Sequence, residues 1–181
     1  MTTSIRNGIL SAATCALFAA TAVHAAAPSV SYDGAPYREQ ELSLDLFGSA
    51  AIGQSTFDHL SRSRISHDSR LGVGAGLNYF FTRNLGAGIE AGTESTSHYL
   101  VDRVAANFIA RFPLGDSGFA PYALVGGGRQ FDPTELWFAH GGGGIEYRFT
   151  PNVGIFTDAR FVLTERTSNY GLFRLGMRFA F

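Results

Sequence analysis

Apolar and polar positions alternate with a period of two along most of the chain after residue 40. Successive side chains of a β-strand point to opposite faces, so this pattern predicts strands with one apolar face and one polar face. The clearest instance is the final stretch, 171–181. Its apolar parity holds Phe173, Leu175, Met177, Phe179 and Phe181, and its other parity holds Arg174 and Arg178 among small or apolar residues.

The alternation predicts about eight strands. They cover residues 42–46, 71–81, 85–91, 103–112, 119–128, 137–149, 153–163 and 171–181. The stretch 119–128 is apolar on both parities, so the pattern does not assign its faces. A soluble sandwich would leave the last strand with an open edge, whereas a closed membrane barrel has no edge. Eight strands are the minimum for a bacterial single-chain barrel.

The predicted connections have two sizes that alternate along the chain. Residues 82–84, 113–118 and 150–152 form tight turns rich in Pro, Asn, Asp and Gly. Longer polar stretches cover residues 54–70, 94–100, 129–135 and 165–170. Short turns on one side and longer loops on the other are typical of outer-membrane barrels, in which the short turns face the periplasm.

The N-terminus predicts export from the cytoplasm. Arg6 precedes an apolar stretch from about Ile9 to Val23, and small residues follow it. This pattern indicates a secretory signal peptide over residues 1–25, whose apolar core is too short for a membrane-spanning helix. Residues 26–40 have no helical period and predict a flexible periplasmic lead-in. The barrel itself is expected over residues 41–181.

Composition excludes several other classes. The formal net charge of −1 argues against an electrostatic nucleic-acid binder. The chain after residue 25 contains no run of about 18 apolar residues, as a helical membrane protein would need, and the mean hydropathy is +0.06. Alternation accounts for this value, because a barrel mixes its two faces in sequence. The one cysteine, Cys15, lies in the predicted signal peptide. Neither a disulfide framework nor a thiolate metal site is expected, and no cofactor is predicted.

Two hairpins share a motif that resembles a known family. Residues 76–86 read Gly-Leu-Asn-Tyr-Phe-Phe-Thr-Arg-Asn-Leu-Gly, and residues 144–154 read Gly-Ile-Glu-Tyr-Arg-Phe-Thr-Pro-Asn-Val-Gly. With the glycine-rich strands and the terminal Phe181, these turns resemble the opacity-type and outer-membrane-protein-A-like family of small eight-stranded barrels. The resemblance covers residues 41–181 and implies an all-β, antiparallel transmembrane β-barrel. No peptidoglycan-binding segment follows the barrel, so a role in cell-wall tethering is not carried over.

The resemblance also implies a location and partners. The expected location is the outer membrane of a Gram-negative bacterium, reached after export across the inner membrane. The expected partners are outer-membrane lipids, lipopolysaccharide and the barrel-assembly machinery, with the chain a monomer. Phe181 and Phe179 correspond to the C-terminal signature by which such barrels are recognised for assembly.

Aromatic residues beside the predicted turns are typical of the girdles at the membrane–water interfaces. The periplasmic girdle is predicted to hold Tyr79, Phe81, Phe112, Tyr147, Phe149 and Phe181. Near the outer interface we expect Tyr99, Trp137 and Tyr170. In a soluble protein the same residues would be ordinary strand aromatics in the core.

If the apolar parity faces lipid, the lumen receives the charged parity. That parity holds Asp45, Asn78, Glu90, Arg103, Asn107, Arg111, Glu146, Arg148, Asp158, Arg160, Arg174 and Arg178. An eight-stranded barrel is only wide enough for side chains to fill it, and unpaired charges there would be very costly. We therefore expect an ion-paired interior that conducts little. Because arginines outnumber acids in this set, a narrow anion path stays open as an alternative.

Catalysis is a further alternative, since some small outer-membrane barrels edit the acyl chains of lipid A with a His and a Ser. Here His140 precedes Gly141 and Gly142, so the nucleophile is missing, and His140 is expected in the lumen. Ser97-His98 and Ser66-His67-Asp68 fall in loops, where adjacent residues point apart.

The first long loop is basic and contains His and Asp residues. It could meet lipopolysaccharide phosphates or bind a metal loosely, although a solvated loop explains the same residues. The sequence thus predicts a non-enzymatic structural or surface-interaction protein. A narrow pore is the alternative, and a lipid A-modifying enzyme is less favoured.

Overall fold

The computed structural model describes residues 35–53, 70–93, 101–131, 135–165 and 169–181, and the backbone of two short strands, β2 (Thr56–Asp58) and β3 (Ser63–Ile65). The predicted signal peptide 1–25, the first part of the lead-in and most of the long loops lie outside the described residues. In the part that is described, no helix is long and apolar enough to cross a membrane.

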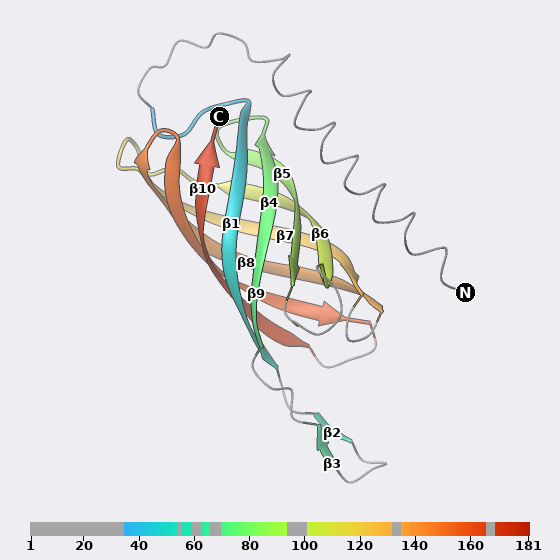
Figure 1. Ribbon diagram of the computed structural model, residues 1–181. Coiled ribbons are helices and arrows are strands. Elements are labelled where there is room, and N and C mark those ends of the chain that lie inside the picture. Colours follow the sequence, from blue (N-terminus) through green and yellow to red (C-terminus); the bar gives the residue numbers. More distant parts are fainter. Residues whose placement is uncertain are drawn as a thin grey trace, which may run out of the picture. The chain divides into compact units, whose positions relative to one another are not determined.

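Eight strands form a closed antiparallel barrel, as predicted (Figure 1). They are β1 (Glu41–Gly53), β4 (Arg70–Phe80), β5 (Leu85–Thr93), β6 (Arg103–Arg111), β7 (Phe119–Gln130), β8 (Leu136–Thr150), β9 (Val153–Thr164) and β10 (Tyr170–Ala180). Around the wall the order is β1-β10-β9-β8-β7-β6-β5-β4, and β4 pairs with β1 to complete the circle. The strands β2 and β3 pair with each other inside the stretch that was expected to be a plain loop.

The outer face of the wall is apolar, as the parity of the strands predicts. Val73, Ile89 and Val125 are each more than 60% exposed. Such exposure of large apolar side chains around a whole wall is expected where hydrocarbon, not water, is the solvent. Tyr170 departs from the prediction, because it is half-buried and packs against apolar residues inside the barrel. It occupies the same parity as Leu172 and not the outward parity of Phe173. Tyr99 lies outside the described residues.

The structure assigns the faces of β7, which the sequence left open. Ala120, Tyr122 and Leu124 point into the barrel and are buried, whereas Phe119 and Val125 point outward. Both parities are apolar here because the lumen contains its own apolar cluster at this height. That cluster consists of Phe47, Phe80, Ile109, Tyr122, Leu124 and Phe156.

Glycines on the inner wall make room for the rings of this cluster. A Cβ placed on Gly176 would lie 2.8 Å from Cβ of Phe47 and 2.9 Å from Cε1 of Phe156. Contacts this short do not occur between real side chains, so β10 needs a residue without a side chain at this position. A second apolar cluster lies toward the long loops and is formed by Ala51, Ala105, Leu136, Phe138, Val162 and Leu172.

Candidate functional site in the barrel interior

The lumen contains two separate networks of buried polar side chains. The short-turn network lies near the three tight turns and consists of Tyr37, Glu41, Asp45, Asn78, Arg111, Glu146, Arg148 and Arg178. The long-loop network lies further along the barrel and consists of Glu90, Asn107, Tyr122, His140, Asp158, Arg160 and Arg174. Between the described residues of the two networks we find no hydrogen bond or ion pair. Phe156 lies between them, with its ring 5.4 Å from Cζ of Arg174 and 5.1 Å from Cζ of Arg178.

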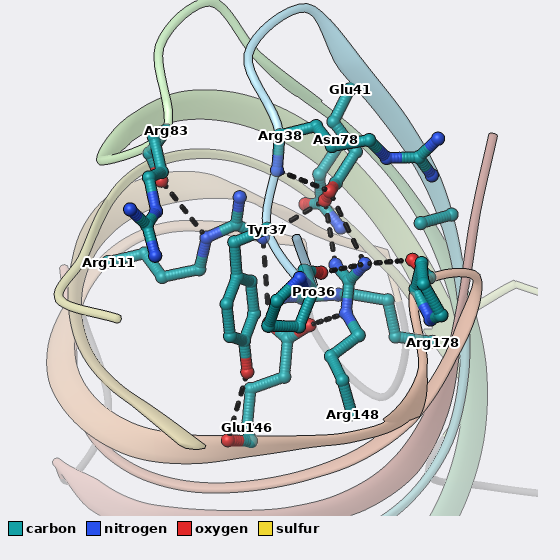
Figure 2. A network of polar contacts seen from close by, with 12 residues as sticks. Pro36, Tyr37, Arg38, Glu41, Asn78, Arg83, Arg111, Glu146, Arg148 and Arg178 are labelled. Carbon is teal, nitrogen blue, oxygen red and sulfur yellow. Dashed lines mark hydrogen bonds and ion pairs between the residues drawn. The ribbon is translucent and has the colours of Figure 1, made fainter. Parts of the chain in front are cut away.

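Glu41 is the centre of the short-turn network (Figure 2). Its Oε1 accepts hydrogen bonds from Nη1 of Arg111 at 2.9 Å and from Nη2 of Arg148 at 2.7 Å. Glu146 accepts from Nε of Arg148 and from Nη1 of Arg178. These side chains come from β1, β6, β8 and β10, so the network joins opposite walls of the barrel. The side chains of Arg111, Arg148 and Glu41 are fully buried. An unpaired charge at this position would be strongly destabilising.

Tyr37 extends the network into the segment before β1. Its hydroxyl donates to the carbonyl oxygen of Gly118 at 2.7 Å and to that of Glu146 at 3.3 Å. The centre of its ring lies 4.5 Å from Cζ of Arg111, and the centre of the Phe80 ring lies 3.8 Å from the same atom. Burial, with a smaller contribution from the Glu146 carboxylate, raises the pKa of the Tyr37 phenol above its ordinary value, so the hydroxyl stays a donor. Residues 35–40 were expected to be flexible, and the structure instead places Tyr37 in the mouth of the barrel.

Asp45 and Arg178 form the pair where β1 meets β10. The two residues are direct register partners. Nε and Nη2 of Arg178 donate to Oδ1 and Oδ2 of Asp45, both at 2.7 Å, in a bidentate arrangement. From the other side of β1, Nδ2 of Asn78 donates to Oδ2 of Asp45 at 2.9 Å. Asp45 thus bonds residues on β10 and β4, the two strands that flank β1.

The long-loop network has a similar pair between β9 and β10. Asp158 and Arg174 are register partners, joined by Nε to Oδ1 at 3.0 Å and Nη2 to Oδ2 at 2.6 Å. Arg160 donates from Nη1 to Oε1 of Glu90 at 2.8 Å, and Arg174 donates from Nη1 to Oε2 of Glu90 at the same distance. The Tyr122 hydroxyl donates to Asp158 at 2.8 Å. Every barrel strand from β5 to β10 contributes to this network.

His140 lies in the lumen, as the sequence predicted, and it belongs to the long-loop network. Its Nε2 is 2.7 Å from Oδ1 of Asn107, and the Asn107 amide donates to Glu90 at 2.9 Å. Nδ1 has no hydrogen-bond partner among the described residues. Within the described ranges, the hydrogen-bond partners of the imidazole are the Asn107 amide and the Arg160 guanidinium. Among the described residues, no group of three or more His, Cys, Asp or Glu side chains is placed to hold a metal ion.

The structure also changes the charge count that the sequence suggested. The described residues include six buried carboxylates, at positions 41, 45, 90, 102, 146 and 158, and six buried guanidiniums, at positions 103, 111, 148, 160, 174 and 178. The expected surplus of arginines is smaller than predicted because Glu41 was not assigned to the interior. Asp102, just before β6, is buried on the outward parity and bonds Thr93. Glu41 precedes the first clear alternation in the sequence, although it shares the inward parity of Ser43 and Asp45. That parity was the available signal for including it.

Arg103 is buried near the long-loop end of the barrel. Its Nη1 lies 3.4 Å from the Tyr170 hydroxyl, and its Cζ lies 5.6 Å from the centre of the Phe138 ring. The remaining arginines of the predicted lumen set lie in one of the two networks.

The predicted aromatic girdle lies on the outside of the barrel beside the short turns. Tyr79 and Phe81 touch edge to face with ring centres 6.2 Å apart, and Tyr147 and Phe149 do the same at 5.2 Å. Phe112 and Phe181 are also exposed on this side. The backbone amide of Phe181 donates to the carbonyl oxygen of Leu42 at 2.8 Å, which continues the pairing of the last strand with β1.

Arg129 is the one charged residue that the described barrel strands carry on their outward parity. It lies at the long-loop end of β7, opposite Trp137 of β8 in register. Its Cζ is 5.7 Å from the centres of the Trp137 and Phe131 rings, and its Nη2 bonds Glu135 at 2.8 Å. Trp137 is 61% exposed, as a residue of the outer interface would be.

Comparison with known proteins identifies the family. The model of the outer membrane protein beta-barrel domain matches residues 13–179. The chain belongs to this family. It is therefore an outer-membrane protein of a Gram-negative bacterium. No curated protein sequence is similar enough to the chain to count as a match.

Solved structures agree on the fold. The N-terminal β-barrel domain of Pseudomonas aeruginosa OprF is 17% identical, with 80% of this chain and 99% of that one covered at a TM-score of 0.56. Neisserial surface protein A is 15% identical, with 79% and 100% covered at 0.57. Yersinia pestis Ail, the attachment invasion locus protein, is 13% identical, with 79% and 99% covered at 0.51. Identities this low are evidence for the shared small barrel and for nothing finer.

Proposed function

We propose that the protein is a non-catalytic barrel of the opacity type, with a structural or surface-interaction role and a lumen closed to solutes. Five buried carboxylates and six buried guanidiniums of the inward parity, most of them joined in ion pairs, carry this proposal. Paired charges fill the interior at two heights, and an apolar cluster lies between them. A conducting path would have to separate several buried ion pairs, of which Asp45–Arg178 and Asp158–Arg174 are each held by two hydrogen bonds.

Recordings from planar lipid bilayers test whether the lumen is closed. Purified protein refolded from residue 26 onward is expected to give no channels of stable size. Heat-modifiable migration in a detergent gel must show that the same sample contains folded barrel. Reproducible channels from a fully folded sample would support the narrow pore, and the closed lumen would then be wrong.

Outer-membrane lipids, and lipopolysaccharide in particular, are the proposed partners of the outer surface. Arg129 supports this, because an arginine fork beside an exposed Trp at the outer interface suits the phosphate of a lipid headgroup. Its bond to Glu135 is exposed on both sides and therefore weak. Lipopolysaccharide should raise the unfolding temperature of the protein in detergent, and dephosphorylated lipopolysaccharide should raise it less.

Two variants decide whether Arg129 takes part. In Arg129→Gln, the difference between the rises in unfolding temperature caused by the two forms of lipopolysaccharide should be about half as large. Arg83→Gln, at the periplasmic end, should keep it. If both variants respond equally to the two forms of lipopolysaccharide, Arg129 does not contact the lipid phosphate.

The remaining parts of the proposal concern processing and chemistry. Residues 1–25 are proposed to be removed as a signal peptide, which N-terminal sequencing of membrane-derived protein would show as a start at or near Ala26.

Phe181 and Phe179 are proposed to be recognised by the barrel-assembly machinery, and their replacement by Ser should lower the amount of folded protein in the outer membrane. Mass spectrometry of lipid A, with and without the gene, should give identical acyl patterns.

A further inference from the structure

The barrel has one strand pair that no nearby turn connects. β4 to β9 each pair with the barrel strands before and after them in the chain, so β1 pairs with β4, the next barrel strand. The exception is β1 with β10, whose register partners lie as far apart as Ser43 and Ala180. We call this pair the seam. In a hairpin, the turn length fixes which residues face each other, but the seam has no turn.

Alternation alone fixes the seam only in part. A shift by one residue would turn the apolar side chains of β1 into the lumen, so burial opposes it. A shift by two residues keeps every side chain on its own face, and the hydrophobic pattern does not oppose it. Some contact between particular side chains must therefore distinguish the observed register from its two nearest alternatives.

Two side-chain matches across the seam, together with the contacts of Glu41 in the lumen, provide this distinction. In the observed register, Asp45 faces Arg178 and Phe47 faces Gly176. A shift by two in one direction would place Asp45 opposite Ala180 and Phe47 opposite Arg178. A shift in the other direction would place Asp45 opposite Gly176 and Phe47 opposite Arg174. Both shifts break the bidentate ion pair and leave Arg178 buried without Asp45.

The match of Phe47 with Gly176 is steric. The glycine leaves the space that the ring and its Cβ occupy, since a side chain there would approach Phe47 to 2.8 Å. Glu41, four residues before Asp45, adds a third condition. It reaches Arg111 on β6 and Arg148 on β8 only when β1 is seated at this height.

We propose that the Asp45–Arg178 pair, with Phe47 and Gly176, selects the register in which the barrel closes, so that the short-turn network determines the specificity of closure. The long-loop network does not share this role, because none of its hydrogen-bonding members lies on β1 or β4. Its own bidentate pair, Asp158–Arg174, joins β9 and β10. A chain connection of a few residues already links these two strands. The two pairs are alike in chemistry and differ in topology, which makes one the matched control for the other.

Disulfide trapping reads the register directly, because residues 26–181 contain no cysteine. Three double-cysteine proteins use outward-facing positions and leave the lumen unchanged. Leu46→Cys with Met177→Cys reports the observed register. Leu44→Cys with Met177→Cys and Gly48→Cys with Met177→Cys report the shifts by two. Each is refolded into lipid vesicles, oxidised, and analysed as the fraction of cross-linked chain.

With the natural lumen, the first protein is expected to cross-link at least tenfold more than either shifted reporter. Introducing Asp45→Asn together with Arg178→Gln removes both charges, so that no buried charge is left alone. The shifted reporters should then rise at least fivefold. The control, Asp158→Asn with Arg174→Gln, should leave the distribution unchanged.

The other outcomes also decide whether the Asp45–Arg178 pair selects the register of the seam. A seam variant that still cross-links only in the observed register overturns the proposal, as does a control variant that shifts equally. If the seam variant does not fold while the control folds, closure depends on the seam pair, as proposed. If neither variant folds, the two pairs are equivalent and the selective role assigned to the seam pair is wrong.

Discussion

The short-turn network and the long-loop network have the same chemistry but join different parts of the barrel. Each contains a bidentate Asp–Arg pair between register partners, further arginine–glutamate bonds, and a tyrosine hydroxyl donor. The first includes β1, β4 and the segment before β1, and the second includes only strands from β5 to β10. The difference teaches that the role of a buried ion pair depends on which strands it connects. A pair within one hairpin region adds stability, while a pair across the seam also reports that the barrel is closed.

The largest effect should follow from removing one fully buried acid of the short-turn network. Glu146→Gln leaves Arg148 and Arg178 with one carboxylate partner fewer in a fully buried site. The free energy of unfolding should fall by about 3–5 kcal/mol, the usual cost of breaking a buried ion pair. Urea titration of protein in lipid vesicles measures this. Glu135→Gln, at an exposed pair, should cost less than about 1 kcal/mol. A similar small loss for Glu146→Gln would mean that the buried network adds little.

A smaller effect is expected from filling the space between the networks. Gly176→Ala places a methyl group against Phe47 and Phe156, and such overpacking costs about 1–3 kcal/mol. Gly48→Ala is the matched substitution on β1, where the nearest atoms are 3.9 and 4.0 Å away. We expect it to be nearly neutral. The same titration compares the two, and equal stabilities would contradict the steric argument for the glycine.

Tyr37→Phe should have a still smaller effect. The ring contacts with Arg111 remain, and only the hydroxyl bonds to Gly118 and Glu146 are lost. The expected loss is about 1 kcal/mol, the net value of a typical buried hydrogen bond. Tyr122→Phe removes the corresponding hydroxyl from the long-loop network and should cost more, because its acceptor is a charged carboxylate. The reverse order would show that the segment before β1 is held more tightly than the middle of the lumen.

The smallest expected quantity is the coupling between the two networks. Asp45→Asn and Asp158→Asn share no hydrogen-bond partner, so their effects on unfolding should add within about 0.5 kcal/mol. The ring of Phe156 lies close to an arginine of each network. A coupling well above this value, abolished by Phe156→Leu, would show that the ring transmits strain between the networks.

Much of this architecture could be predicted from the sequence, because parity is a local property. The inward placement of Asp45 and Arg178 follows from their apolar neighbours on either side. The partners could not be predicted in the same way, since Asp45 could equally have faced another arginine until the register of the seam was known. The faces of β7 were ambiguous because the lumen itself is partly apolar around Tyr122. Tyr37 could not be placed, because a single aromatic before the first strand carries no periodicity.

The position of Tyr37 also matters for anyone who produces the protein. A shortened version that starts at Glu41 would retain every strand yet lack the phenol ring that packs on Arg111 and Arg148. Affinity tags joined directly to β1 would place foreign residues in that same space. Recombinant material should therefore begin no later than Ala35, with any tag separated from it by a cleavable spacer.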